Sequence, residues 1–392
     1  MVVIRGRNRG RGADFGAATH QDAATDGLLQ VPSGRWLFTG SDGLVTAYAS
    51  GPEGLIRWTE TPSGAFTGPE SIEVPRWVGP LTLSRSGEGY VHFAGLRWPV
   101  GGGPAHVVVS AQFQSGRGLM DWYDLGVPAA PGVEGEDTVV FGPVVVVNPV
   151  TGGVHVLVSL RAGGIVRRVR SGEGRWGRWK SVTTDPYTGE FAAAMPAGGS
   201  LEVLAVGRAG VDRWVGASGG RFELRDRFTT PIADGTQTAV ETGPKRTTYF
   251  WRYPGDDSLV AWRAQSRTSQ GGLMALGGAG GGGRPGAART TIGGYDCTVL
   301  AQRGGHGGVE VSAYVTENEG YGAWWASLGE TGPGSSAPQV AVDGAGRIVV
   351  AVLDKAGDLL VARQDLTQDG LAFGGWTRHG GADAGSVGPW QR

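Results

Sequence analysis

The chain has 392 residues, of which 73 are glycine, and its formal net charge at pH 7 is −1. The glycine share is far above the usual ~7% but follows no Gly-X-Y period, which excludes collagen. A charge near zero argues against bulk attraction to nucleic acid or to an acidic membrane surface. No apolar run approaches the ~18 residues that cross a bilayer, so no membrane span is expected.

The first segment in chain order, residues 1–26, differs in composition from the rest. It carries Arg5, Arg7, Arg9 and Arg11 among glycines and matches no other part of the chain. A basic, glycine-rich segment of this kind is expected to be an arm that orders when it docks on an acidic partner surface. Specific nucleic-acid binding is the less favoured interpretation.

From residue 27 to 382 one pattern recurs at intervals of roughly fifty residues: short alternating apolar runs separated by Gly-rich turns. The units cover about 35–74, 78–123, 141–184, 187–230, 235–279, 288–330 and 337–381. The sixth unit is one strand short unless residues 289–292 supply it. Period-two alternation predicts strands, and four short strands cannot bury both of their faces alone. The sequence therefore predicts an all-β, seven-bladed β-propeller of four-stranded antiparallel blades.

Two short segments border this repeat region. Residues 27–31 could close the ring by pairing with the last blade. Residues 383–392 follow the last repeat and are expected to be a C-terminal tail.

Two segments carry a resemblance to a known family. Residues 199–210 contain Leu-Glu-Val-Leu-Ala-Val and are followed by Asp-Arg-Trp at 212–214, and residues 174–182 read Gly-Arg-Trp-Gly-Arg-Trp-Lys-Ser-Val. These spellings resemble the seven-bladed bacterial propeller lectins of the Photorhabdus lectin type, and more distantly the tectonin and fungal fucose-lectin propellers. Units three, four and seven match best, and the other units depart from the family's pattern. The resemblance implies a ring with sugar pockets between neighbouring blades.

Candidate ligand residues follow from what sugars need, which is an aromatic face for their C–H surface and polar partners for their hydroxyls. The third strands of four units carry arginine, in most cases beside tryptophan, and arginine donates in bidentate fashion to hydroxyls or carboxylates. The alternative is that these tryptophans fill the space between adjacent sheets. The carbohydrate-binding candidates are Arg57, Trp58, Arg167, Arg168, Arg213, Trp214, Trp262, Arg263 and Trp325.

Tryptophans of the fourth strands are expected to pack between blades rather than to contact ligand. They are Trp122, Trp176, Trp179, Trp325 and Trp376. Trp324 and Trp325 are adjacent on one expected strand, so their side chains should point to opposite faces. One of the two is then exposed, and an exposed tryptophan is typical of a binding surface.

Catalysis and metal binding have little support in the sequence. The chain lacks the Ser-x-Asp-x-Gly-x-x-Trp boxes of propeller sialidases. The strand carboxylates Glu202, Asp212, Glu310 and Asp121 could form a hydrolytic pair only if they converged. Cys297 is the one cysteine and is expected to be a small buried residue. No enzyme activity, metal site or cofactor is expected.

These observations favour a non-enzymatic carbohydrate-binding propeller that recognises a cell-surface glycan. The N-terminal apolar stretch is too short for a signal peptide, which predicts cytoplasmic synthesis and release as part of a virion or injection particle, for example as a receptor-binding phage tail component. The alternative is a structural interaction scaffold docked to a particle protein through residues 1–26. A glycoside hydrolase is the third hypothesis.

Overall fold

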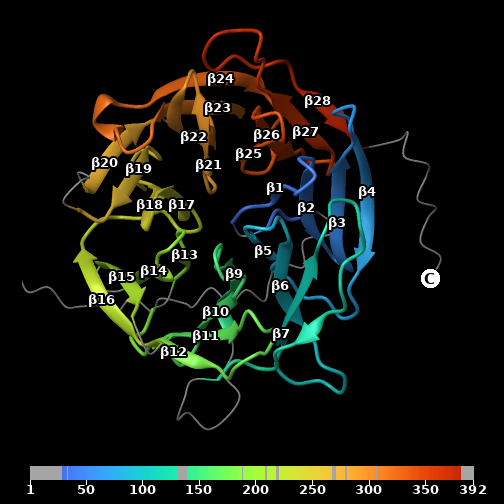
Figure 1. Cartoon of the computed structure of the whole chain (residues 1–392), viewed down its shortest axis with the longest axis vertical. Coiled ribbons are helices and arrows are strands. Elements are labelled where there is room, and N and C mark those ends of the chain that lie inside the picture. Colours follow the sequence, from blue (N-terminus) through green and yellow to red (C-terminus); the bar gives the residue numbers. More distant parts are fainter. Residues whose placement is uncertain are drawn as a thin grey trace, which may run out of the picture.

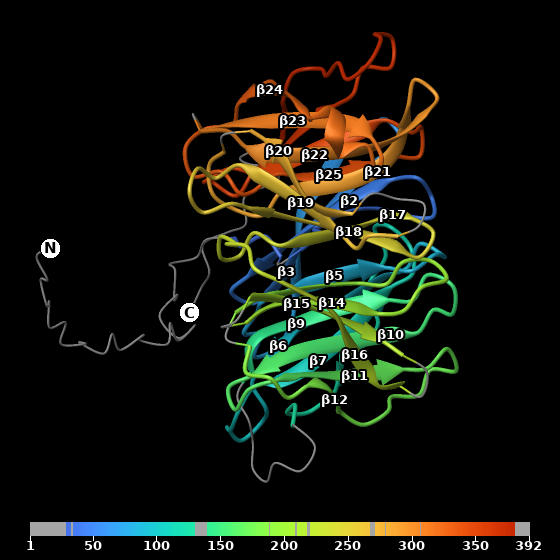
Figure 2. The ribbon, with the colours of Figure 1, turned by 90° about the vertical axis from the view of Figure 1, so that its left-hand side faces the viewer.

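Alternating apolar and polar residues between glycine turns form β-strands along the whole described chain. The computed structural model describes residues 29–32, 34–129, 139–187, 189–207, 210–217, 220–266, 271–278, 280–305 and 307–380. Their strands make seven four-stranded antiparallel sheets, arranged as the blades of a ring (Figure 1). Figure 2 views the ring from its rim, with the strands running across its thickness. The predicted seven-bladed β-propeller is confirmed, and the described residues contain no α-helix.

The first three blades come from the N-terminal half of the chain. Blade 1 consists of β1 (Leu37–Thr39), β2 (Val45–Gly51), β3 (Gly54–Glu60) and β4 (Phe66–Glu73). Blade 2 consists of β5 (Thr82–Arg85), β6 (Val91–Arg97), β7 (His106–Gln112) and β8 (Tyr123–Asp124). Blade 3 consists of β9 (Val139–Val147), β10 (Val154–Leu160), β11 (Ile165–Arg170) and β12 (Lys180–Thr183).

The next two blades continue the ring in chain order. Blade 4 consists of β13 (Phe191–Ala194), β14 (Glu202–Gly207), β15 (Gly210–Gly216) and β16 (Phe222–Phe228). Blade 5 consists of β17 (Thr238–Gly243), β18 (Arg246–Arg252), β19 (Leu259–Arg263) and β20 (Gly272–Gly277).

The last two blades bring the chain back to blade 1. Blade 6 consists of β21 (Gly286–Ile292), β22 (Tyr295–Arg303), β23 (Gly308–Val315) and β24 (Trp324–Glu330), with the 3₁₀ helix η2 (Glu319–Tyr321) before β24. Blade 7 consists of β25 (Gln339–Val342), β26 (Ile348–Leu353), β27 (Leu359–Arg363) and β28 (Thr377–His379). Residues 289–292 do supply the first strand of the sixth unit, as part of β21.

The core of the molecule lies between the blades rather than inside any one of them. Among the described residues, seven clusters of buried apolar side chains each join two neighbouring blades. Strand β10 shows the principle, because Val156 packs towards blade 2 while Leu157 packs towards blade 4. Burying a side chain of this size contributes about 1.5–3 kcal/mol. Each sheet therefore depends on both neighbours, and the apolar faces are all covered only in a closed ring.

Ring closure differs from one sequence-based expectation. Gln30 exchanges two backbone hydrogen bonds with Ser50 of β2, at 2.9 and 2.8 Å, so this segment pairs with blade 1 and not with the last blade. Pairing of residues 27–31 with the last blade is therefore wrong. All four strands of blade 7 come from the C-terminal part of the chain, and side chains join it to blade 1. The expected arm (1–26) and tail (383–392) lie outside the described residues.

Hydrogen bonds support the same junction between blades 7 and 1. The Thr39 hydroxyl donates to the Val342 carbonyl at 2.5 Å, and the Gly344 N–H donates to the Gly43 carbonyl at 2.9 Å. A Cβ atom on Gly344 would lie 2.8 Å from the Gly43 Cα. Only glycine at this point allows the two turns to approach so closely.

Candidate functional site

The seams between blades contain the residues that the repeats single out. We call the face of a blade that looks towards the next blade in chain order its forward face, and the opposite one its backward face. Side chains alternate along a strand, so neighbouring arginine and tryptophan residues point to opposite faces. Arg57 reaches the backbone of Gly116 in blade 2, whereas Trp58 packs in the cluster shared with blade 7.

The third-strand arginines of blades 1 and 5 are buried, and each has a carboxylate partner within the protein. Arg57 forms an ion pair with Glu70 at 2.6 Å. Arg263 forms one with Glu319 of blade 6 at 2.7 Å, and both side chains are only 1% exposed. A buried charge that has its counter-charge is stable, whereas loss of either partner is costly. Arg263 therefore ties blade 5 to blade 6 through its ion pair, and Arg57 ties blade 1 to blade 2 through the Gly116 carbonyl.

The tryptophans of the same two blades are equally enclosed. Trp58 is fully buried, and Trp262 stacks on Phe228 of blade 4 with ring centroids 4.6 Å apart. The order of the two residues differs, because Trp58 follows Arg57 whereas Trp262 precedes Arg263. Both tryptophans nonetheless lie on the backward face, Trp58 towards blade 7 and Trp262 towards blade 4. Neither ring presents a face to solvent, which agrees with the packing alternative for these two positions.

Blade 3 uses its two adjacent arginines to reach both neighbours. Arg167 donates to the Gly220 carbonyl of blade 4 at 2.9 Å and lies over the Phe222 ring at 4.7 Å. Arg168 donates to the Leu125 carbonyl at the outer edge of blade 2. A carbonyl and an aromatic face satisfy an arginine without neutralising it.

Trp214 is half-buried and held by a chain of hydrogen bonds at the seam of blades 3 and 4. Its Nε1–H donates to the Tyr187 hydroxyl at 2.6 Å, and that hydroxyl donates to Asp212 at 2.8 Å. Arg227 pairs with Asp212 at 2.6 Å and lowers the pKa of that carboxyl. Burial raises the pKa of Tyr187, so this hydroxyl stays a donor at neutral pH. The network fixes the indole while leaving part of it open.

Arg213, beside Trp214, points to the opposite seam. It pairs with Glu202 at 2.9 Å and with Asp226 at 2.6 Å, and Tyr249 of blade 5 donates to Glu202 at 3.0 Å. Glu202 and Asp212 therefore lie on opposite faces of blade 4, each with its own cation. The hypothesis that the strand carboxylates converge finds no support from this pair.

Three outer-edge tryptophans share one contact. Each donates its Nε1–H to a carbonyl at the outer edge of the preceding blade: Trp179 to Leu125 at 3.4 Å, Trp325 to Leu276 at 2.9 Å and Trp376 to Leu328 at 2.8 Å. The expectation that these side chains pack between blades is confirmed.

Trp324 and Trp325 point to opposite faces, as predicted. Trp324 is 83% exposed, whereas Trp325 is the one anchored to blade 5. The nominated Trp325 is therefore a packing residue in this structure. Tyr321, three residues before Trp324, is also exposed.

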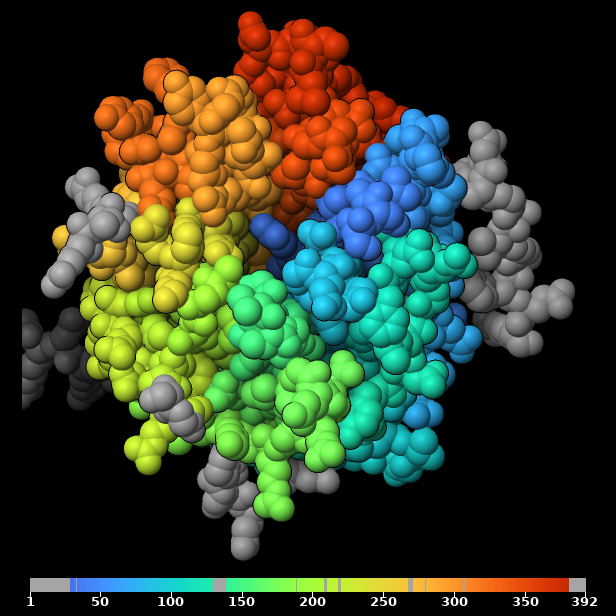
Figure 3. Space-filling view, viewed as in Figure 1, coloured from blue at the N-terminus to red at the C-terminus, as the bar shows by residue number. Residues whose placement is uncertain are grey.

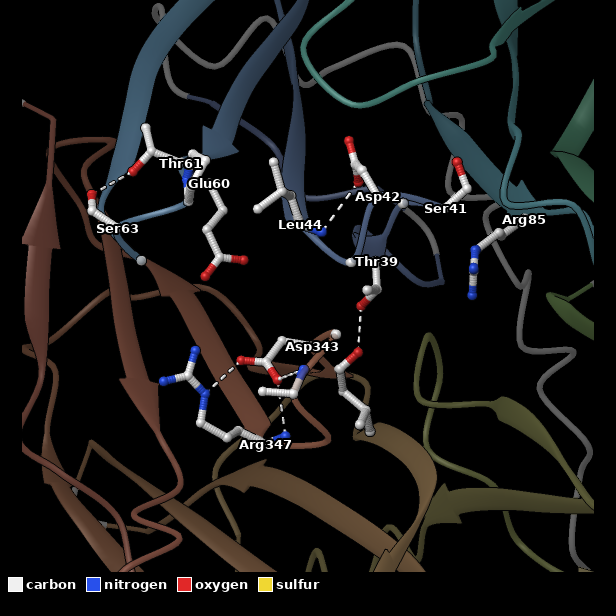
Figure 4. A pocket seen from close by; sticks show the side chains of 17 residues that line it. Thr39, Ser41, Asp42, Leu44, Glu60, Thr61, Ser63, Arg85, Asp343 and Arg347 are labelled. Atoms are coloured by element: carbon white, nitrogen blue, oxygen red, sulfur yellow. Dashed lines mark hydrogen bonds and ion pairs between the residues drawn. The ribbon is translucent and has the colours of Figure 1, made fainter.

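A cavity of about 790 Å³ opens where blades 7 and 1 meet (Figure 4). It is formed by the turns between the first two strands of both blades and by the turn between β3 and β4. Its side-chain lining consists mainly of hydroxyl and charged groups: Thr39, Ser41, Asp42, Glu60, Thr61, Ser63, Arg85, Asp343 and Arg347. None of the nine nominated residues lines this cavity.

Two nearly buried carboxylates lie at the wall of this cavity. Glu60 is 4% exposed and pairs with Arg363 at 2.8 Å, while it also accepts the Val45 N–H at 2.7 Å. Asp343 is 3% exposed and pairs with Arg347 at 2.7 Å. Figure 4 shows these acids approaching from the two blades. The arrangement can accept and donate hydrogen bonds to a hydroxyl-rich ligand, although none of the described lining residues is aromatic.

Sequence reasoning missed this cavity because its parts are about three hundred residues apart in the chain. The available signal is the Asp-Gly dipeptide of two equivalent turns, at 42–43 and 343–344. Only the register of the closed ring places these turns together.

No group of three or more His, Cys, Asp or Glu side chains among the described residues could hold a metal ion. Glu317 and Glu319 pair with Arg246 and Arg263 instead. Within the same ranges, no helix is long and apolar enough to cross a membrane.

Comparison with known proteins establishes the fold of this chain but assigns it to no family. No protein-family model and no curated protein matches the sequence. The structure of the BP39L lectin from Burkholderia pseudomallei matches with a TM-score of 0.69 at 14% identity, over 89% of this chain and 99% of the lectin. AofleA from Arthrobotrys oligospora matches with a TM-score of 0.50 at 8% identity, over 77% of this chain and 85% of that protein. The chain thus has the propeller fold of a bacterial lectin.

Proposed function

We propose that this protein is a non-enzymatic carbohydrate-binding propeller, which recognises a cell-surface glycan at the seam of blades 7 and 1. The observation that carries the proposal is the cavity of about 790 Å³ at that seam. The BP39L lectin, matched over 99% of its length, supports it at the level of fold.

The lining matches the hydrogen-bonding needs of a sugar. A sugar hydroxyl donates one hydrogen bond and accepts up to two, so it needs acceptors and donors side by side. Glu60 and Asp343 are acceptors, and Arg347 and the hydroxyls of Ser41 and Ser63 can donate. Hydrogen bonds to charged groups contribute about 1.5–3 kcal/mol each, and one open pocket of this kind predicts weak binding to a single sugar.

Aromatic faces are available elsewhere on the ring. Trp214 is half-buried with its polar edge fixed, and Trp324 is exposed at the rim of blade 6. Several weak sites on one rigid ring raise the overall affinity for a multivalent surface by about two to four orders of magnitude. Of the tryptophans nominated at the third strands, Trp214 is the one whose ring stays partly open, and it remains a candidate on this basis.

The second part of the proposal is that the protein belongs to a particle, such as a phage tail or an injection particle, and binds the glycan as its receptor-binding component. It is supported by the arginine-rich sequence of residues 1–26, which suits docking on an acidic partner protein. The structural scaffold is the rival function. Deleting residues 1–26 would abolish particle assembly if these residues dock, and would leave glycan binding by the ring unchanged.

A glycan array with the full-length chain tests the binding proposal. We expect a signal for the wild type that falls about ten-fold in Arg347→Ala, because the cavity loses one charged donor. Arg161→Ala is the matched control, since Arg161 is exposed in a turn of blade 3 and does not line the cavity. Chromogenic glycosides on the same samples should show no turnover. A wild type without any array signal would favour the scaffold.

A further inference from the structure

The centre of the ring holds a second cavity that the proposed function does not use. Figure 3 shows the ring hollowed at its middle, and the inner strands of blades 1 to 5 line a space of about 280 Å³ there. Four charged side chains line it: Arg35, Arg85, Arg284 and Glu241.

Arg284 is the one lining arginine that has a counter-charge among the residues that the structure describes. It pairs with Glu190 at 2.8 Å. Its Nη1 atom lies close to Gly34, the residue before Arg35, at 3.7 Å from the point where a Cβ would stand on that glycine. Within the described residues, the Ala287 carbonyl is the one acceptor to which Arg35 donates, at 3.0 Å. Neither Arg35 nor Arg85 forms an ion pair with any carboxylate of the described residues, Glu241 included.

Arg35 and Arg85 are therefore like charges that face the same confined space. Desolvation by the surrounding inner strands, with the charge of Arg85 added, lowers the pKa of Arg35, and desolvation also lowers the pKa of Arg85. Both residues are nonetheless exposed, to the solvent of the channel. Two guanidinium groups held this way repel each other, and a counter-ion between them would remove that cost.

We propose that the channel binds a small oxyanion between Arg35 and Arg85. Guanidinium groups recognise phosphate, sulfate and carboxylate with parallel N–H donors, so the shared chemistry is a planar or tetrahedral set of anionic oxygens. Arg85 also lines the cavity at the seam of blades 7 and 1. The anion therefore has two sources: a free ion from solution, or the acidic group of a sugar that enters from that cavity.

Calorimetric titration of the full-length chain with sodium sulfate, against sodium chloride at equal ionic strength, tests this site. We expect saturable sulfate binding by the wild type, weakened about ten-fold in Arg85→Gln and in Arg35→Gln, because each removes a charged donor. Arg161→Gln should bind as the wild type does. Absence of saturable binding, or equal binding by all three variants, would overturn the site.

Competition separates the two sources of the anion. Displacement of sulfate by glucuronate but not by glucose assigns the site to an acidic sugar group, and failure of glucuronate to compete assigns it to a free ion. Thermal unfolding guards against a folding defect, since Arg85→Gln in sulfate-free, low-salt buffer should melt no lower than the wild type. A lower melting temperature for both variants in that buffer would contradict the repulsion. Neutral-glycan binding on the array is measured separately, so either proposal can fail alone.

Discussion

Arg363 in the last blade forms an ion pair with Glu60 in the first, with 2.8 Å between nitrogen and oxygen. The pair bridges the only seam whose two blades come from opposite ends of the described chain. It lies beside Thr39 and Val342, which join the same blades through a hydrogen bond. Closure therefore rests on specific polar contacts as well as on the apolar cluster that blades 7 and 1 share.

Breaking this pair should cost stability. Arg363→Met leaves the nearly buried Glu60 without its cation, and we expect about 3 kcal/mol of destabilisation in urea unfolding. The control is Arg225→Met, which breaks the exposed Arg225–Glu223 pair within blade 4 and should cost less than about 1 kcal/mol. Equal losses in the two variants would show that the closing pair has no special role.

The two adjacent tryptophans of β24 should differ in their contribution to folding. Trp325→Phe removes the hydrogen bond to Leu276 and should destabilise the protein by about 1 kcal/mol. Trp324→Phe changes an exposed side chain and should stay within about 0.5 kcal/mol of the wild type. Thermal unfolding of both variants checks this, and a larger loss for Trp324→Phe would reverse the assignment of faces.

Stability should fall in mild acid because of two buried histidines. Burial, with the charge of Arg170 or Arg167 added, lowers the pKa of His92 and of His155 to about 4. The unfolded chain takes up these protons near pH 6.5, so it binds more protons than the folded chain between about pH 6.5 and 4. Each histidine then lowers the free energy of unfolding by about 3 kcal/mol at pH 4.

Urea unfolding at pH 7, 5.5 and 4 measures this dependence. The variants His92→Gln and His155→Gln should each lose less stability between pH 7 and 4 than the wild type does. An unchanged pH dependence in both variants would mean that the folded protein accommodates the protonated rings.

Trp214 offers a test of the seam between blades 3 and 4. Trp214→Phe keeps a ring in the apolar cluster but removes the indole that Tyr187 holds. We expect a reduced glycan-array signal with an intact fold, measured beside Tyr187→Phe, which keeps the indole but loses the hydroxyl and its hydrogen bonds to Trp214 and Asp212. Full binding by Trp214→Phe would leave Trp214 as a packing residue.

The repeat pattern was enough to predict the seven blades because strand alternation and glycine turns are local properties of the backbone. Adjacent residues on a strand must diverge, so one exposed tryptophan at 324–325 was predictable. Its identity was not, because the pairing of Trp324 with Ala313 sets which side chain faces outward. The partner of Gln30 likewise depends on tertiary packing, which explains the wrong closure.

The candidate site was less predictable than the fold. Arginine and tryptophan at third strands suggested ligand contacts, but burial at Arg57 and Arg263 depends on acids supplied from other elements, Glu70 of β4 and Glu319 of η2. No local sequence pattern predicts which acidic residue will pair with a given arginine. The cavity between blades 7 and 1 exists only after the ring closes.

A crystal structure of the full-length chain soaked with a mixture of monosaccharides tests the central claim most directly. We predict a seven-bladed ring with sugar density in the cavity between Glu60 and Asp343. Well-ordered crystals in which that cavity holds only water, while sugar occupies other seams or none, would contradict it.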